Sequence, residues 1–238
     1  MITLEDVKNS PDFKLMIEKA QDYLSERGYT EHGFRHVNYV ADLTAYILKQ
    51  LNYSEHQVEL GSIAAYLHDV GNMFNRKHHG ISGANIVYNE LRRREVPLED
   101  ICQITTAIAN HEEEIGQPVS PITAALILAD KSDAHRTRAN KENADAIHDR
   151  VNFAIKDSRV EVDPENMNIS LYIDFDTSIC QVMDYFEIYL HRMEMCKAAS
   201  THLGCRFRLI INNLKILGRL VDTSGESNLQ SILKEQQG

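Results

Sequence analysis

Residues 65–72 read AYLHDVGN, and this stretch decides how the rest of the chain is interpreted. It ends a segment that starts near Ser54, in which apolar residues recur every three to four positions, the spacing of one face of a helix. His68 continues that apolar face, and Gly71 is a typical helix stop. The stretch therefore predicts a helix with His68 on its buried side and Asp69 directly after it.

Four further predicted helices each carry a histidine or an aspartate in phase with their apolar residues or at their first turn. These residues are His36 in the helix of residues 35–51, His79 at the start of a helix near residue 80, His111 after the apolar face of residues 101–108, and Asp130 in a helix with Ser120 as its expected N-cap and Pro121 as its first residue. The first 140 or so residues contain almost no strand pattern. They therefore predict a helical bundle whose titratable side chains meet in its core.

Such a concentration of titratable groups in an apolar core requires compensation, because unpaired charges and unsatisfied polar groups are costly to bury. A metal ion would supply it. Neutral imidazoles and carboxylates suit Mn²⁺, Fe²⁺, Co²⁺, Ni²⁺ and Zn²⁺, and Mg²⁺ less well. We therefore expect one or two divalent metal ions, with six ligands: His36, His68, Asp69, His79, His111 and Asp130.

Three segments that contain these residues resemble, in the same order, the sequence motifs of the HD superfamily of metal-dependent phosphohydrolases. The matching segments are RHVNYVADL (35–43), AYLHDVGN (65–72) and LILADKSDA (126–134). HHGISGANIV (78–87) and ANHEE (109–113) resemble the additional histidine segments of members with two metals. The resemblance covers about residues 30–140. It implies that His36, His68, Asp69 and Asp130 bind the first metal, and that Asp69 bridges to a second metal held by His79 and His111.

The chain is also similar to the HD-GYP branch of this family, but it departs from it at two points. Asp133 completes a D-x-x-D-A run after Asp130, as in that branch. However, Asn72 stands where HD-GYP proteins usually have lysine, and IGQPVSP (115–121) replaces the Gly-Tyr-Pro motif. Cyclic-di-GMP hydrolysis is therefore disfavoured. The resemblance leaves hydrolysis of a phosphate mono- or diester, in a nucleotide or another small phosphorylated metabolite.

The expected reaction is attack by metal-bound hydroxide, because a divalent ion lowers the pKa of its bound water from about 15.7 toward 7. Asp69 is expected to position that water or to accept its proton. Negative charge on the phosphoryl group requires a further cation, and Arg35, Arg76, Lys77 and Lys131 all lie close to motif residues. Asp69, Lys131 and Arg76 are the preferred catalytic residues.

The composition favours a small-molecule substrate. The 238 residues carry a formal net charge of -10, which opposes binding to a nucleic-acid duplex. No apolar run is long enough to cross a bilayer, and the first residues do not read as a secretory signal, so we expect a cytoplasmic protein without a membrane partner. The four cysteines form no C-x-x-C pair and are expected to be free thiols.

After about residue 150 the pattern changes to short β-favouring runs around one helix. The expected strands are VNFAI (151–155), RVEV (159–162), ISLYIDF (169–175) and RFRLIINNLKIL (206–217), and the expected helix spans residues 177–203 with Met183 and Leu190 on its apolar side. The predicted fold is mostly α: an HD-type helical core over residues 1–150, a small α+β appendage over 151–222 and a polar tail over 223–238. Short strands can leave exposed edges, which suggests a homodimer.

Two other interpretations fit the same residues. The first is a non-catalytic sensor that binds metal or a nucleotide, an interpretation that Asn72 keeps open. The second is a scaffold in which the histidines are only structural. His32, one turn before His36, is expected to support a ligand rather than to bind metal.

Overall fold

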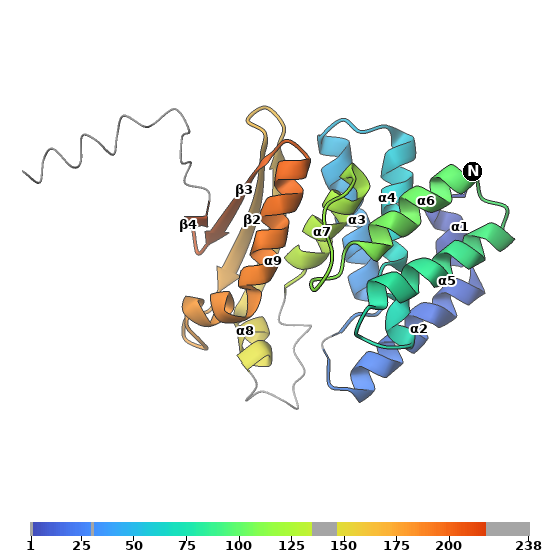
Figure 1. Cartoon of the computed structure of the whole chain (residues 1–238). Coiled ribbons are helices and arrows are strands. Elements are labelled where there is room, and N and C mark those ends of the chain that lie inside the picture. The colour runs from blue at the N-terminus through green and yellow to red at the C-terminus, as the bar shows by residue number, and fades with distance from the viewer. Residues whose placement is uncertain (1, 30, 135–146, 218–238) are drawn as a thin grey trace, which may run out of the picture.

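A helical bundle occupies one side of the molecule and a four-stranded sheet with one long helix occupies the other (Figure 1). The computed structural model describes residues 2–29, 31–134 and 147–217. The bundle consists of α1 (Leu4–Asn9), α2 (Pro11–Glu26), α3 (Phe34–Gln50), α4 (Glu55–Leu67), the 3₁₀-helix η1 (Val70–Met73), α5 (His79–Arg93), α6 (Leu98–Ala109) and α7 (Pro121–Ser132). This confirms the predicted mostly α fold with a small C-terminal α+β part.

Helices α4 and α7 form the centre of the bundle. Every residue from Leu60 to Leu67 in α4 is buried, and so is every residue from Ile122 to Ser132 in α7. A helix that is apolar all round is surrounded by other elements, and α7 packs against α3, α4, α6 and α9. Ser120 caps α7 as predicted, because its hydroxyl accepts a hydrogen bond from the Thr123 backbone N–H at 3.1 Å. The last turn of α7, with Asp130 and Lys131, is therefore held inside the molecule.

The C-terminal unit begins with α8 (Ile147–Ala154) and continues with β1, β2, α9 and two further strands. The strands are β1 (Ile155–Asp163), β2 (Asn168–Phe175), β3 (Arg206–Ile211) and β4 (Leu214–Leu217), in the spatial order β1-β2-β3-β4. β2 and β3 are parallel and are joined by α9 (Val182–His202), whereas the two outer pairs are antiparallel. In Figure 1, α9 lies between the sheet and α7, so this helix connects the unit to the bundle.

Three details of the predicted appendage are wrong. VNFAI (151–155) is not a strand: α8 covers all of it except Ile155. Val151 and Ala154 are buried three residues apart, and Asn152 accepts a hydrogen bond from the Tyr189 hydroxyl at 2.7 Å, so packing against α9 overrides the β propensity.

The helix predicted for residues 177–203 begins only at Val182, because Gln181 and Asp184 form a capping box. Its predicted apolar side also includes two residues that are exposed, Met183 at 70% and Leu190 at 51%. Tyr189 and Met193, which were also predicted for that side, are buried, and so is Tyr185, which was not.

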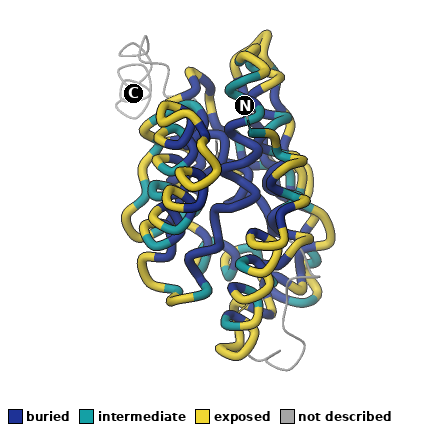
Figure 2. Tube along the Cα trace, turned by 90° about the vertical axis from the view of Figure 1, so that its right-hand side faces the viewer, coloured by how far each residue is buried: buried dark blue, intermediate teal, exposed yellow. Residues whose placement is uncertain are grey.

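One buried apolar cluster runs through both parts of the molecule (Figure 2). It contains Leu67 and Leu126 of the bundle as well as Leu171 and Leu209 of the sheet. Polar contacts also join the parts. Among them, the Ser158 hydroxyl donates to the Ser132 carbonyl at 2.7 Å, and the Tyr46 hydroxyl accepts from the Val162 N–H at 3.3 Å.

The four cysteines are free thiols, as predicted. None of the described helices combines the length and the hydropathy that a membrane span requires. The predicted tail, residues 223–238, and the last residues of the predicted appendage, 218–222, lie outside the described part of the chain.

Candidate metal centre

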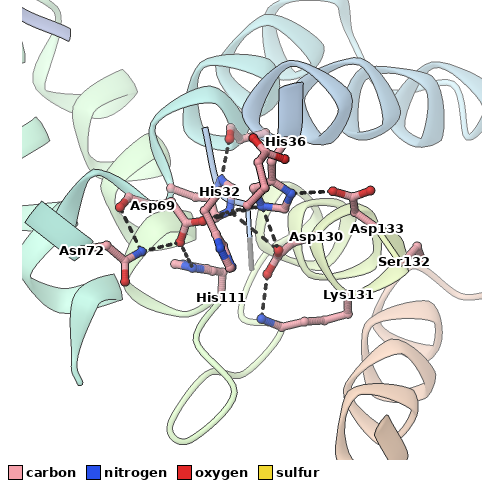
Figure 3. A network of polar contacts seen from close by, with 12 residues as sticks. His32, His36, Asp69, Asn72, His111, Asp130, Lys131, Ser132 and Asp133 are labelled. Carbon is pink, nitrogen blue, oxygen red and sulfur yellow. Dashed lines mark hydrogen bonds and ion pairs between the residues drawn. The ribbon is translucent and has the colours of Figure 1, made fainter. Parts of the chain in front are cut away.

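Four donor atoms converge at one end of the bundle (Figure 3), two from helices α3 and α7 and two from His68 and Asp69, which lie between α4 and η1. His36 Nε2 lies 3.2 Å from His68 Nε2, 3.5 Å from Asp69 Oδ2 and 3.4 Å from Asp130 Oδ1. His68 Nε2 lies 3.3 Å from the same Asp69 oxygen and 3.7 Å from the same Asp130 oxygen. Ligands about 2.1 Å from a shared ion lie roughly 3 to 3.5 Å from one another in tetrahedral or octahedral geometry. The spacing therefore fits one ion.

A second donor set lies on the other oxygen of Asp69. Asp69 Oδ1 is 3.3 Å from His79 Nε2 and 3.9 Å from His111 Nε2, and the two imidazole nitrogens are 3.1 Å apart. His79 is the first residue of α5, and His111 follows the end of α6. Asp69 thus faces both sets, with one carboxylate oxygen toward each.

A close backbone contact places His79 beside Asp69. Gly71 of η1 lies so near to α5 that a Cβ atom on it would be 2.0 Å from the His79 carbonyl oxygen and 2.5 Å from the Gly83 nitrogen. Only glycine permits this approach. Gly71 has no left-handed backbone conformation, so its role is this contact with α5, and not the helix-stop conformation expected from the sequence.

All four histidines are oriented by their second ring nitrogen. The Nδ1 atoms of His68, His79 and His111 lie 2.6, 2.9 and 2.6 Å from backbone carbonyl oxygens. Carbonyl oxygens only accept hydrogen bonds, so each Nδ1 donates. His36 Nδ1 lies 2.6 Å from Asp133 Oδ2. With the proton on Nδ1, each Nε2 faces the centre and can bind a metal once it carries no proton, which is the arrangement of metal-binding histidines.

Two carboxylates support these histidines from outside the donor sets. Asp133 also accepts from the Arg35 guanidinium at 2.7 and 3.2 Å, which fixes its position behind His36. Glu112 accepts from the N–H groups of His78 and Gly80 at 2.8 and 3.2 Å, and its carboxylate lies 3.3 Å from His79 Nδ1. Glu112 therefore caps α5 and orients its first side chain.

The protonation states of the metal-free protein reflect the crowding of these groups. Burial acts to raise the pKa of Asp69, but His68 and His79 outweigh it and hold that pKa well below its ordinary value. Burial also acts to raise the pKa of Asp130, but Lys131, with His36 and His68, holds that pKa well below its ordinary value. Burial acts to lower the pKa of His68, yet the neighbouring carboxylates raise it to about 10. The pKa of His111 is lowered by burial and by the positive charge of His68 and His79.

The donor set fits a divalent cation. The side chains of His36, His68, Asp69 and His111 are almost fully buried, and Asp69 Oδ2 is a buried carboxylate oxygen without a hydrogen-bond partner. In the metal-free protein the charged imidazole of His68, 3.3 Å away, lies beside this ionised oxygen, and when His68 is neutral another cation is needed there. Imidazole nitrogens and carboxylates together are ligands of the first-row divalent metals. His36, His68, Asp69 and Asp130 could hold one ion, and Asp69, His79 and His111 a second.

The centre opens toward a large cleft between the bundle and the C-terminal unit. A small pocket of about 10 Å³ lies directly over the donors and is lined by residues that include Asp69, His79 and Asp130. We refer to it as the slot. The cleft has a volume of about 660 Å³ and shares His32, Arg76, His79, Glu113 and Arg192 with the slot. A small molecule in the cleft could therefore reach the metal donors.

The cations predicted from the sequence lie at different places. Lys131 is buried, lines the slot and donates to Asp130 Oδ2 at 2.6 Å. Arg76 lines both slot and cleft, 4.0 Å from Asp69 Oδ1. Lys77 lines only the cleft, and Arg35 is engaged with Asp133 and Glu31.

Two further histidines lie close in sequence to the predicted ligands. His32 lies edge-on to His36, with ring centroids 5.2 Å apart, and lines the slot. The supporting role expected for it stays a prediction. His78 is exposed, in contrast to its neighbour His79.

Sequence reasoning missed three residues of the site. Glu112 and Glu113 follow His111 directly, and their proximity to a predicted ligand was the signal that could have drawn attention to them. Arg192 comes from α9 and lines the slot. No motif marks it, because its place at the site depends on how α9 packs against α7.

Comparison with known proteins agrees with the arrangement of these residues. Residues 33–137 match the family model described as HD domain, and this range contains all six predicted ligands. No curated protein matches the chain. Residues 33–137, the part of the bundle that carries the convergent histidines and aspartates, are therefore similar to the HD domain, the domain that names the HD superfamily of metal-dependent phosphohydrolases.

Proposed function

We propose that the protein is a metal-dependent phosphohydrolase that cleaves a phosphate mono- or diester of a nucleotide or another small phosphorylated metabolite. The observation that carries the proposal is the pair of donor sets that share Asp69, placed at the base of a cleft. The match to the HD domain supports the same chemistry. Mn, Fe, Co, Ni, Zn and Mg remain the candidate metals.

The residues around the donors suit a reaction at a phosphoryl group. Bound divalent ions would acidify a coordinated water and offset negative charge on the phosphoryl oxygens. Asp69 is ionised and would hold the nucleophilic water or take up its proton. Lys131 and Arg76 face the slot as fixed cations, so they would stabilise charge that develops on the phosphoryl oxygens.

The cleft favours a small substrate over a polymer. Its volume of about 660 Å³ lies within the range of small-molecule sites. Tyr29, which is 43% exposed, lines it together with exposed polar side chains such as Asn75, so it offers both aromatic surface and hydrogen-bonding groups. These features support a nucleotide, whose base stacks on aromatic rings and whose phosphate requires cations.

The test is turnover of a panel of nucleotides and generic phosphoesters by the purified, Mn²⁺-loaded protein. We expect hydrolysis that requires metal and is lost in Asp69→Asn. Asp100→Asn is the matched control, because Asp100 is also buried and pairs with a histidine, His56 at 2.9 Å, away from the centre. Absence of any turnover that depends on both metal and Asp69 would contradict the proposal.

A non-catalytic sensor is the second candidate, and Asn72 is the observation that favours it. Its amide donates to Asp69 Oδ1 at 2.8 Å, at the position where related catalytic sequences often have lysine. In such a sensor the cleft would bind a nucleotide and the C-terminal unit would transmit the bound state. Tight nucleotide binding without hydrolysis would support this alternative.

A homodimer and a cytoplasmic location stay predictions from the sequence. Light scattering of the purified protein tests the first, and a monomeric mass across the accessible concentration range would contradict it.

A further inference from the structure

Arg192, a residue of the C-terminal unit, places a positive charge beside the metal donors. It lies on α9, and it lines both the slot over the donors and the cleft. Its guanidinium carbon stacks 4.6 Å from the centre of the Tyr189 ring, which orients the side chain. No part of the proposed reaction so far uses this residue.

Arg192 forms an ion pair with Glu113 at the slot. Arg192 Nε lies 2.6 Å from Glu113 Oε1, and Lys131 Nζ lies 3.8 Å from the same oxygen. The Nε atom is nevertheless without a well-directed hydrogen bond, although the distance is short. The contact is therefore an ion pair with poor directionality, and Glu113 occupies a position between two cations beside the metal donors.

Glu113 belongs to a loop, whereas the two cations lie on packed helices. The loop runs from the end of α6 to the start of α7, and His191 Nε2 lies 2.7 Å from the Glu113 carbonyl oxygen. Glu113 retains some exposure, with 29% of its side chain accessible. A side chain on such a loop can move away at lower cost than Arg192 or Lys131, which are fixed by helix packing.

The charge balance of the slot favours an anionic ligand. Three carboxylates and three cations line it, so their formal charges cancel when the histidines are neutral ligands. These residues are Asp69, Asp130, Glu113, Arg76, Lys131 and Arg192. Each divalent ion would add two positive charges, and a phosphate group in the slot would offset them.

We propose that Arg192 binds the phosphoryl group of the substrate, which displaces the Glu113 carboxylate from between Arg192 and Lys131. The inference rests on the proposed phosphohydrolase function and extends it, because the C-terminal unit then completes the active site. A planar guanidinium suits this role, since it can donate two parallel hydrogen bonds to phosphate oxygens. Glu113 holds Arg192 and Lys131 in place until the phosphate arrives.

The test measures binding of inorganic phosphate to the full-length, Mn²⁺-loaded protein by equilibrium dialysis, alongside turnover. Arg192→Gln is expected to weaken phosphate binding by about tenfold or more, the usual effect of losing charge-assisted hydrogen bonds. Arg192→Lys keeps the charge and is expected to lose less. Glu113→Gln removes the competing carboxylate, so its phosphate affinity should rise.

Arg159→Gln is the matched control. Arg159 also stacks on a tyrosine, Tyr172 at 4.4 Å, and pairs with a glutamate, Glu161 at 3.0 Å, but it lies on β1 and does not line the slot or the cleft. Its loss should leave the phosphate affinity unchanged. Metal content, measured by elemental analysis, should be normal in all four variants. If Arg192→Gln loses metal or does not fold, the phosphate affinities of Arg192→Lys and Glu113→Gln test the inference in its place.

The outcomes separate this inference from the proposed function. Phosphate affinity that stays unchanged in Arg192→Gln, or in Arg192→Lys where that variant decides, overturns the inference, as does a wild-type protein that does not bind phosphate. A Glu113→Gln variant that binds phosphate no better overturns the displacement of Glu113. If no substrate is turned over but phosphate affinity still depends on Arg192, the hydrolase proposal fails, whereas the phosphate-binding role of Arg192 stands.

Discussion

Asp133 holds the imidazole of His36 from behind, and this contact is the clearest case of a residue that acts on the metal centre through another. Its carboxylate lies 2.6 Å from His36 Nδ1, so it fixes the ring and its tautomer. We expect Asp133→Ala to weaken metal affinity by about 10- to 100-fold. Asp133→Asn should cost less, because its amide oxygen can still accept from Nδ1. Competition with a chromophoric chelator measures both.

Arg35 provides the control for this prediction. It forms the ion pair with Asp133 but does not touch His36 in the observed hydrogen bonds. Arg35→Gln should therefore leave most of the metal affinity intact. An equal loss in Arg35→Gln and Asp133→Ala would mean that the ion pair, and not the orientation of His36, matters.

Protonation of the His68 imidazole should make metal binding depend on pH. Its pKa is about 10 in the metal-free protein, because Asp69 and Asp130 outweigh the effect of burial, so the imidazole is charged at pH 7. This charge stabilises the metal-free fold below the ordinary pKa of 6.5, and the stabilisation is lost as the pH rises through about 10. Metal binding requires the Nε2 lone pair, so about one proton must leave His68. Metal affinity should therefore rise with pH between 6.5 and 10.

Calorimetry of metal binding at pH 7 in buffers of different ionisation enthalpy measures this release. The pKa of His79 is also raised, by Asp69 and Glu112 against burial, so His79 adds to the count. A heat of binding that does not depend on the buffer would contradict the prediction.

The candidate ligands could be found from the sequence because helical phase decides which side chains face a core. His36, His68 and Asp130 are each in phase with apolar residues of their own helix, and the structure brings their side chains together. Their role as metal ligands stays a prediction. Arg192 could not be found in this way, since its position at the slot depends on the contact between α9 and α7.

At the scale of elements, the approach of η1 to α5 holds the two donor sets together. A methyl group on Gly71 would collide with the backbone at His79 and Gly83. Backbone atoms cannot rotate away from a steric clash as side-chain atoms can, so Gly71→Ala must push η1 and α5 apart. We expect a loss of about 1–3 kcal/mol in the free energy of unfolding. The second donor set, which spans this contact, should lose metal before the first.

Elemental analysis and chemical unfolding test this prediction together. Gly61→Ala is the control, because the nearest atom to its new methyl group is the side-chain Leu48 Cδ1 at 2.7 Å, which can rotate away. Gly61→Ala should keep its metal. If Gly71→Ala binds as much metal as the wild type, the contact does not position His79.

Elements were predicted best where their pattern was long and local. The helices with His36, His68 and Asp130 follow their apolar period and their caps. The strand predicted for VNFAI was wrong. Val, Phe and Ile favour a strand on propensity alone, but four of these five residues belong to α8, which packs against α9. Exposed Met183 and Leu190 likewise show that apolar residues on a helix do not all belong to its buried face.

At the scale of the whole molecule, the apolar core does not stop where the bundle ends. Buried residues of α7, α9 and the sheet belong to one cluster, so the sheet helps to support the last turn of α7, with Asp130 and Lys131. The sequence could indicate the change from helices to strands near residue 150. It could not indicate this shared core, because the packing of α9 between α7 and the sheet is a long-range contact.

The shared core predicts that the bundle and the C-terminal unit unfold together. Leu209 lies fully buried at the centre of β3, and Leu209→Ala should cost about 2–5 kcal/mol. We expect one calorimetric transition in the wild type and in the variant, shifted as a whole to lower temperature, and raised again by Mn²⁺ because the metal binds only the folded site. Leu214→Ala is the control, since Leu214 is 68% exposed in the adjacent strand, and its transition should not move. If instead Leu209→Ala splits the transition, and the part that Mn²⁺ stabilises keeps its wild-type midpoint, then the bundle folds without the sheet, and Arg192 reaches the slot from a unit that can separate from it.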